Sequence, residues 1–164
     1  MANDMRPLIA THDESLDLML QRTVPVRREL VWRAWTEPEQ LMKWFCPRPW
    51  KVVRCEIDLR PGGRFFTVMQ SPEGQEYPGE GCYLEVVPGE RLVWTDAMSA
   101  GFRPNAQSMM TGVLTLADAP DGGTVYTARA IHATPEVRQQ HADMGFDGGW
   151  STALDQLVEH VQSL

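Results

Sequence analysis

Residues 141–161 read HADMGFDGGWSTALDQLVEHV, and this stretch decides the fold class. After the glycines, apolar residues recur every three or four positions, which is the spacing of one face of an amphipathic helix. The apolar face consists of Phe146, Trp150, Leu154, Leu157, Val161 and Leu164. Such a face has to be covered by apolar surface, and the strands predicted upstream offer the only large one. We therefore expect a long C-terminal helix packed on a sheet.

Three glycines interrupt the apolar pattern where this helix starts. Inside a helix, each glycine costs up to about 1 kcal/mol relative to alanine. The segment from Met144 to Gly149 therefore predicts either a helix break capped by Asp147, or a close approach of the backbone to the sheet or to a ligand. The helix break is the favoured interpretation, because it explains the glycines without a ligand. A preceding helix start is predicted at Thr134 and Pro135.

The middle of the chain predicts about seven antiparallel strands. Apolar and polar residues alternate in it with the period of half-buried strands, as where Val53, Cys55, Ile57 and Leu59 alternate with charged residues. Short turns rich in glycine and proline connect the segments, which is typical of antiparallel hairpins. The strands are predicted over residues 15–24, 53–59, 65–70, 81–87, 91–97, 109–116 and 124–132.

Two short helices are predicted after the first strand. Apolar residues fall at helical spacing over 26–36. Thr36 followed by Glu39 is the pattern of a capping box that starts a second helix, with Pro38 in its first turn. The predicted fold is thus α+β, a curved antiparallel sheet wrapped around the long C-terminal helix.

The size and charge of the chain narrow the class of protein. Its 164 residues fit one domain, expected over 15–164 after a polar leader at 1–14. The net charge is −7, and the 15 lysines and arginines are scattered, which argues against a nucleic-acid partner. No apolar run approaches the roughly 20 residues that span a bilayer. We expect a cytoplasmic protein without membrane insertion, either a monomer or a weak homodimer.

Cysteines and histidines predict neither a metal site nor a cofactor site. Cys46, Cys55 and Cys82 are odd in number and lack a paired spacing, so they are interpreted as small buried hydrophobes. No two histidines have a metal-ligand spacing on one element. His132 and His141 lie near a potential pocket mouth, where either would serve as an acid or base. Ordinary surface or strand-end histidines are the favoured interpretation.

Five segments resemble the family named for the activator of the heat-shock-protein-90 ATPase, within the START-like or SRPBCC superfamily. They are LVWRAWTEPEQLMKWFCP at 30–47, IDLRPGGRF at 57–65, GCYLEVVPGERLVWT at 81–95, GGTVYTARAIHAT at 122–134 and the C-terminal stretch quoted above. The resemblance runs from about Ser15 to the C-terminus. It implies the helix-grip fold, a scaffold that serves lipid carriers, hormone receptors and polyketide cyclases.

A sheet curved around a helix leaves room for a pocket, which is typically apolar with a few polar groups. The alternative is that the large side chains simply fill the core. No catalytic residue is assigned. The candidate pocket wall comprises Trp44, Phe66, Tyr83, Trp94, Met110, Arg129, His132, Phe146 and Trp150.

Three functions are consistent with these observations. The first is binding of a small hydrophobic or amphipathic molecule between sheet and helix, which needs no catalytic group. The second is a cyclase- or hydrolase-like enzyme that uses His132, Tyr83 or Arg129 in the same pocket. The third is a chaperone-associated partner role, which the family name implies and which ranks last because a separate chaperone-docking domain does not fit in this length.

Overall fold

The longest strand, β4 (Glu76–Val87), joins the two parts of a single seven-stranded antiparallel sheet. The strand order is β1-β9-β8-β5-β4-β3-β2, so the first two strands in sequence form opposite edges of the sheet. The other six strands are β1 (Asp17–Val24), β2 (Lys51–Ile57), β3 (Arg64–Gln70), β5 (Arg91–Thr95), β8 (Thr111–Asp118) and β9 (Thr124–Ile131). This computed structural model describes residues 8–164. The first half of the predicted leader, residues 1–7, lies outside that range.

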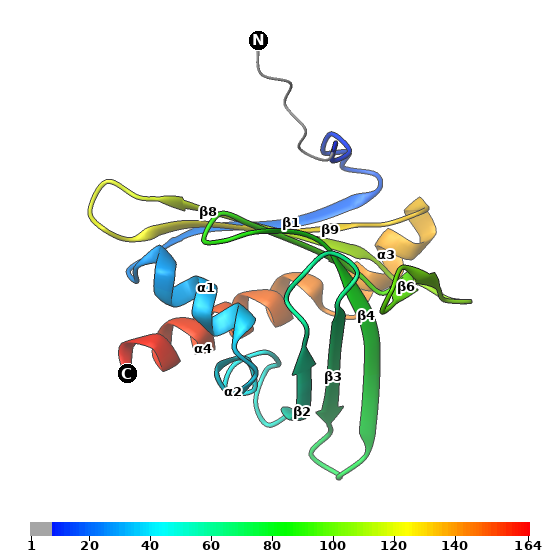
Figure 1. Ribbon diagram of the computed structural model, residues 1–164, viewed down its shortest axis with the longest axis horizontal. Coiled ribbons are helices and arrows are strands. Elements are labelled where there is room, and N and C mark those ends of the chain that lie inside the picture. The colour runs from blue at the N-terminus through cyan, green and yellow to red at the C-terminus, as the bar shows by residue number, and fades with distance from the viewer. Residues whose placement is uncertain (1–7) are drawn as a thin grey trace.

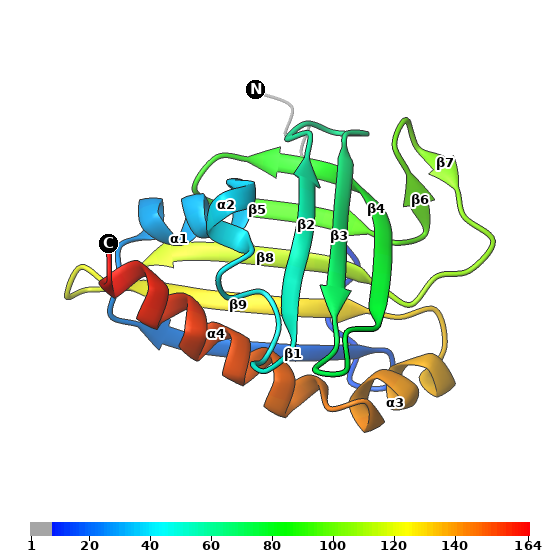
Figure 2. The same cartoon turned by 90° about the horizontal axis from the view of Figure 1, so that it is seen from below.

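The curvature of the sheet comes from β4. Its first half pairs with β3 and its second half pairs with β5, and the register shifts between Tyr83 and Glu85. Such a bulge bends a strand and increases its twist. Figure 2 shows the result: β2, β3 and β4 run across the direction of β1, β9, β8 and β5. The sheet therefore has a strongly concave face.

Within residues 8–164, four helices accompany the sheet: α1 (Arg28–Thr36), α2 (Pro38–Leu41), α3 (Pro135–Asp143) and α4 (Phe146–Gln162). Helix α4 lies on the concave side, together with α1 and α2 (Figure 1). Leu154 and Leu157 of α4 are almost fully buried and belong to one core cluster with Leu92 and Leu114 of the sheet. The predicted α+β helix-grip fold is thereby confirmed. No helix within residues 8–164 has the length and apolarity needed to cross a membrane.

The glycine run breaks the C-terminal helix at one position. Gly145 has a φ of 93°, in the left-handed region, and separates α3 from α4. The Thr134 hydroxyl accepts a hydrogen bond from the Val137 amide at 3.2 Å, so the predicted start of α3 is confirmed. Asp147 lies in the first turn of α4 rather than capping it, which corrects that part of the prediction. Leu164 was predicted to pack, but it follows the end of α4 and is 68% exposed.

Two local predictions were wrong: the residues that face inward at the start of β2, and the capping box at Thr36. A bulge between Val52 and Arg54 shifts the register of β2, so Val52 is buried and Val53 is 36% exposed. The capping box of Thr36 does not form either. Its hydroxyl donates to the Trp32 carbonyl at 2.8 Å, because Thr36 is still the last residue of α1. The small hairpin of β6 (Met98–Ser99) and β7 (Arg103–Pro104) was not predicted.

Candidate functional site

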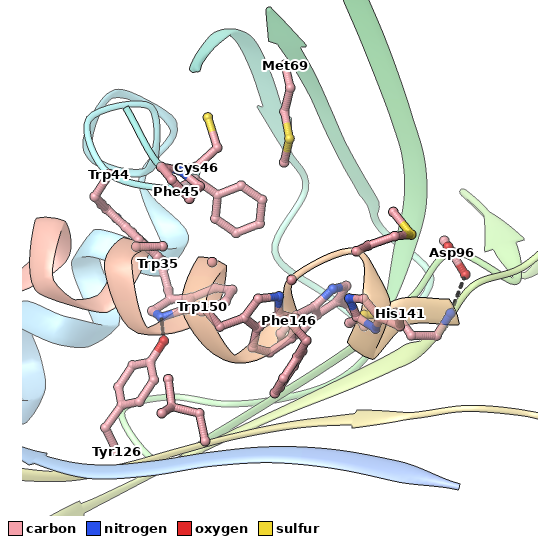
Figure 3. A pocket seen from close by; sticks show the side chains of 18 residues that line it. Trp35, Trp44, Phe45, Cys46, Met69, Asp96, Tyr126, His141, Phe146 and Trp150 are labelled. Carbon is pink, nitrogen blue, oxygen red and sulfur yellow. Dashed lines mark hydrogen bonds between the residues drawn. The ribbon is translucent and has the colours of Figure 1, made fainter. Parts of the chain in front are cut away.

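A cavity of about 420 Å³ lies between the concave face of the sheet and the first turns of α4. Pockets that hold small molecules have volumes of roughly 300 to 1,000 Å³. Figure 3 shows its lining, in which indole and phenyl rings predominate. Its aromatic side chains come from α1, from the segment after α2, from β5 and β9, and from α3 and α4.

One wall is an aromatic cluster around Trp35 of α1. Its ring centroid lies 5.0 Å from Trp44 and 5.1 Å from Trp94. The Trp35 indole nitrogen donates to the Tyr126 hydroxyl at 3.1 Å, and the Trp44 indole nitrogen donates to the Ala34 carbonyl at 3.0 Å. Because both indole N–H groups have partners, this wall offers apolar ring surface to a guest.

A buried glutamine of α4 holds the segment that carries Trp44. The Gln156 side-chain nitrogen donates to the carbonyls of Trp44 at 3.1 Å and Cys46 at 2.8 Å. Its side-chain oxygen accepts from the Arg48 amide at 2.9 Å. Buried polar groups need such partners, so these bonds attach residues 44–48 to α4. Gln156 thus positions one side of the cavity without lining it.

Trp94 takes its place in the wall because Gly112 lies opposite on β8. The two residues are register partners in the β5–β8 pair. A Cβ atom at position 112 would lie 2.3 Å from the Trp94 ring, closer than real Cβ contacts. Only glycine therefore leaves room for this indole against β8.

The opposite wall consists of Phe146 and Trp150 of α4, whose ring centroids lie 4.4 Å apart. The His141 imidazole of α3 meets the Phe146 ring edge-to-face, with centroids 5.3 Å apart. Gly145 and Gly149 bring backbone to the cavity surface on the same side. The favoured helix break is thus present at Gly145, and Gly145 and Gly149 also border the cavity.

His141 is held by a second histidine, and the pair has a defined proton arrangement. His132 Nδ1 lies 2.7 Å from the Leu16 carbonyl oxygen, which only accepts, so Nδ1 carries the proton. In the neutral ring His132 Nε2 is then an acceptor, and His141 Nδ1, at 2.9 Å, is the donor. It follows that His141 Nε2 carries a lone pair. The pKa of His141 is lowered to about 4, mainly because the ring is buried. The neighbouring His132 also lowers this pKa, whereas Asp96 raises it. The low pKa keeps the His141 ring neutral at pH 7.

Asp96, at the end of β5, is the charged residue of the lining. Its Oδ1 accepts hydrogen bonds from the amides of Met109 and Met110 and from the Ser108 hydroxyl, at 2.9, 3.1 and 2.9 Å. These bonds hold the loop before β8. Cys46 also lines the cavity, but burial raises the pKa of its thiol to about 11, so it behaves as a small hydrophobe.

Five candidate wall residues do lie at the cavity. They are Trp44, Trp94, Met110, Phe146 and Trp150. His132 lies behind His141 instead of in the lining. Tyr83 is buried elsewhere in the core, stacked on Phe65 with the ring planes 7° apart.

Phe66 and Arg129 lie on the other face of the sheet, contrary to the prediction. Phe65 packs in the core, so its neighbour Phe66 points outward, where the Arg64 guanidinium lies 4.0 Å from its ring centroid. Tyr126 faces the cavity, so Arg129, an odd number of residues further along β9, faces away. Arg129 pairs there with Asp17 at 2.9 Å.

Sequence reasoning missed several lining residues, notably Trp35, Tyr126 and Asp96. Trp35 and Tyr126 are recognisable as inward-facing from helix and strand periodicity, but periodicity does not distinguish aromatics that line a cavity from aromatics that fill the core. Asp96 follows β5 with no local pattern that marks it. Within residues 8–164 no group of three or more His, Cys, Asp or Glu side chains is arranged to hold a metal ion, and the three cysteines are free thiols.

Comparisons with known proteins define the family and the fold. The family described as Activator of Hsp90 ATPase homolog 1-like protein matches residues 25–162. A crystal structure of a protein from Nitrosomonas europaea is 49% identical, with a TM-score of 0.89, and the match covers 93% of this chain and 97% of that one. A structure from Mycobacterium smegmatis is 30% identical, with a TM-score of 0.75 and coverage of 91% and 93%.

A protein from Rhodobacter sphaeroides is 24% identical over 92% of this chain and 94% of that one, with a TM-score of 0.79. At this identity the likeness shows the fold alone. None of the curated proteins matches the chain significantly.

Proposed function

Because the chain belongs to the family of Activator of Hsp90 ATPase homolog 1-like proteins, we propose that it binds a small hydrophobic or amphipathic molecule in the cavity between the sheet and α4. The observation that carries this proposal is the cavity itself. Close-packed protein interiors leave few voids larger than a water molecule. A space of about 420 Å³ bounded by indole, phenyl and thioether groups is matched in size and polarity to an apolar guest.

The side chains that line the cavity support binding of an apolar guest. The enzymatic hypothesis relied on His132, Tyr83 and Arg129, and all three lie outside the lining. Methionine side chains at the cavity, Met69, Met110 and Met144, adapt readily to irregular guests. Met144 is 68% exposed and lies beside the αL residue Gly145, which places a flexible apolar side chain at the rim.

A direct test is the binding of Nile red, a neutral dye that fluoresces in apolar surroundings. We expect saturable binding to the full chain, and we expect the variant Gly149→Leu to weaken it at least tenfold. A Cβ at position 149 meets only Pro47, at 4.0 Å, so a leucine there fits the helix and extends into the cavity.

The matched control is Gly148→Leu, at an exposed position where a Cβ meets nothing within 4 Å. Both variants place a leucine, which favours helix, in α4. They therefore differ in whether the added side chain extends into the cavity. Equal dye binding by the two variants, or no saturable binding by the unaltered chain, would refute the proposed site.

A further inference from the structure

Asp96 and His141 are polar side chains of the cavity lining, and they lie toward the same end of the cavity (Figure 3). They are close enough that the Asp96 charge acts on the pKa of His141. Away from this end the lining is dominated by aromatic rings and thioether groups. A guest with one polar group would therefore direct it toward Asp96 and His141.

Both groups offer hydrogen-bond acceptors to that end. His141 Nε2 carries a lone pair, since Nδ1 donates its proton to His132, and Nε2 has no partner among residues 8–164. On Asp96, three donors converge on Oδ1, whereas Oδ2 receives only the Met109 amide, at 3.0 Å, which it shares with Oδ1. A carboxylate oxygen accepts two hydrogen bonds, so Oδ2 retains accepting capacity.

The charge at this end of the cavity is negative. Asp96 is the acidic side chain of the lining, and within the described part of the chain no lysine or arginine lines the cavity to balance it. Trp94, Trp150 and Phe146 also line the cavity, and the face of an aromatic ring attracts cations. A carboxylate or phosphate placed between the Asp96 and His141 side chains would meet two acceptors, a like charge and no cationic side chain, which is costly in a partly desolvated site.

On the basis of the proposed function, we propose that the ligand is an apolar or aromatic amine whose ammonium group donates hydrogen bonds to Asp96 Oδ2 and His141 Nε2. Its body lies against the indoles of the cavity. A primary alkyl amine is protonated at pH 7, as lysine is, so it supplies both the donors and the positive charge. Charge-assisted hydrogen bonds of this kind are stronger than neutral ones.

The test compares three molecules with the same body and different heads: 2-(1-naphthyl)ethylamine, 2-(1-naphthyl)ethanol and 1-naphthylacetate. Each is titrated into the full chain at pH 7 against bound Nile red, which has neither a charge nor a donor. We expect the amine to displace the dye at a concentration at least tenfold lower than the acid requires, with the alcohol between them. An equal or reversed order refutes the inference about the head group. So does dye binding that none of the three molecules displaces, and in both cases the proposed function stands.

The variant Asp96→Asn assigns the effect to the carboxylate. Its amide oxygen still accepts from the 108–110 loop, so we expect the fold and Nile red binding to be kept and the amine to lose about tenfold in affinity, with little change for the alcohol. The control Asp147→Asn removes the same charge from an exposed position in the first turn of α4 and should leave the three affinities unchanged. If Asp96→Asn leaves the ratio of amine to alcohol affinity intact, Asp96 does not bind the head group.

Discussion

At the scale of single residues, two buried tyrosines show how differently the same hydroxyl group contributes. The Tyr126 hydroxyl accepts from the Trp35 indole nitrogen at 3.1 Å and anchors one wall of the cavity. The Tyr83 hydroxyl is equally buried, but it has no hydrogen-bond partner among the described residues. An unpaired buried hydroxyl costs free energy, whereas a paired one is roughly neutral or favourable.

Opposite effects on stability are therefore expected for the two Tyr→Phe substitutions. Tyr126→Phe leaves the Trp35 N–H unpaired and should lower the free energy of unfolding by about 1 to 3 kcal/mol. Tyr83→Phe removes only an unsatisfied group and should leave stability unchanged or raise it. Urea denaturation of both variants provides the measurement. A loss of stability in Tyr83→Phe similar to that in Tyr126→Phe would show that its hydroxyl has a partner.

His141 makes stability depend on pH in a defined direction. Its pKa is lowered to about 4 in the folded protein by burial, with a further contribution from His132, while the unfolded chain has the ordinary value of 6.5. Between these values the unfolded state binds more protons. The free energy of unfolding should thus fall as the pH drops from 6.5 toward 4, by an amount on the order of 1 to 3 kcal/mol, and this contribution is fully present above pH 6.5.

Urea denaturation at pH 7.5, 6.0, 5.0 and 4.5 checks this expectation when it is run in parallel on His141→Gln. The glutamine amide can still donate to His132, while the titrating ring is gone. Carboxylates titrate in both proteins, so the difference between the two curves isolates His141. Parallel curves across the whole range would contradict a lowered pKa at this residue.

At the scale of elements, backbone irregularities place the side chains that matter. The bulge in β4 turns the sheet, the bulge in β2 exchanges Val53 for Val52 on the inner face, and Gly145 redirects the chain from α3 into α4. Each irregularity shifts which residues share a face, since strand side chains alternate with a period of two. The cavity therefore depends on these three features as much as on its lining.

Two glycines of the α3–α4 segment should respond to alanine in opposite directions. Gly145 has a φ of 93°, which an L side chain adopts at a cost of about 1 to 2 kcal/mol, so Gly145→Ala should destabilise the protein. Gly148 is helical and exposed, and a Cβ there meets nothing within 4 Å, so Gly148→Ala should stabilise by up to about 1 kcal/mol. Melting temperatures of the two variants give the comparison. A stabilised Gly145→Ala would mean that the break between α3 and α4 tolerates a continuous helix.

At the scale of the whole molecule, the apolar core and the charged surface have separate roles. The core joins α1 and α4 to the concave face, and its burial is the main favourable term in folding. The ion pairs of Arg64 with Glu56 and Glu80 lie on the outer face and are partly exposed, so each contributes little to stability. The Arg64 guanidinium covers the Phe66 ring on that face. The cavity lining on the inner face contains Asp96 as its charged residue.

The sequence by itself determined the order of the main-sheet strands and of the helices, the helix-grip fold and the apolar character of the space under α4. These properties follow from local periodicity and turn chemistry, because residues three or four apart on a helix, or two apart on a strand, share a face whatever surrounds them. Trp150 and Phe146 were identified in this way. Side-chain type alone favours Phe66 and Arg129 as pocket residues, but strand parity places both on the outer face of the sheet.

Only the tertiary structure decided which groups meet at the cavity. The His132–His141 pair, the approach of Asp96 to His141 and the position of Trp94 over Gly112 join segments that are apart in the chain. Such contacts depend on strand register, bulges and the angle between sheet and helix, which arise when the whole core packs at once. Local sequence pattern carries no information on these distances, and this is why the polar end of the cavity became visible only in the folded chain.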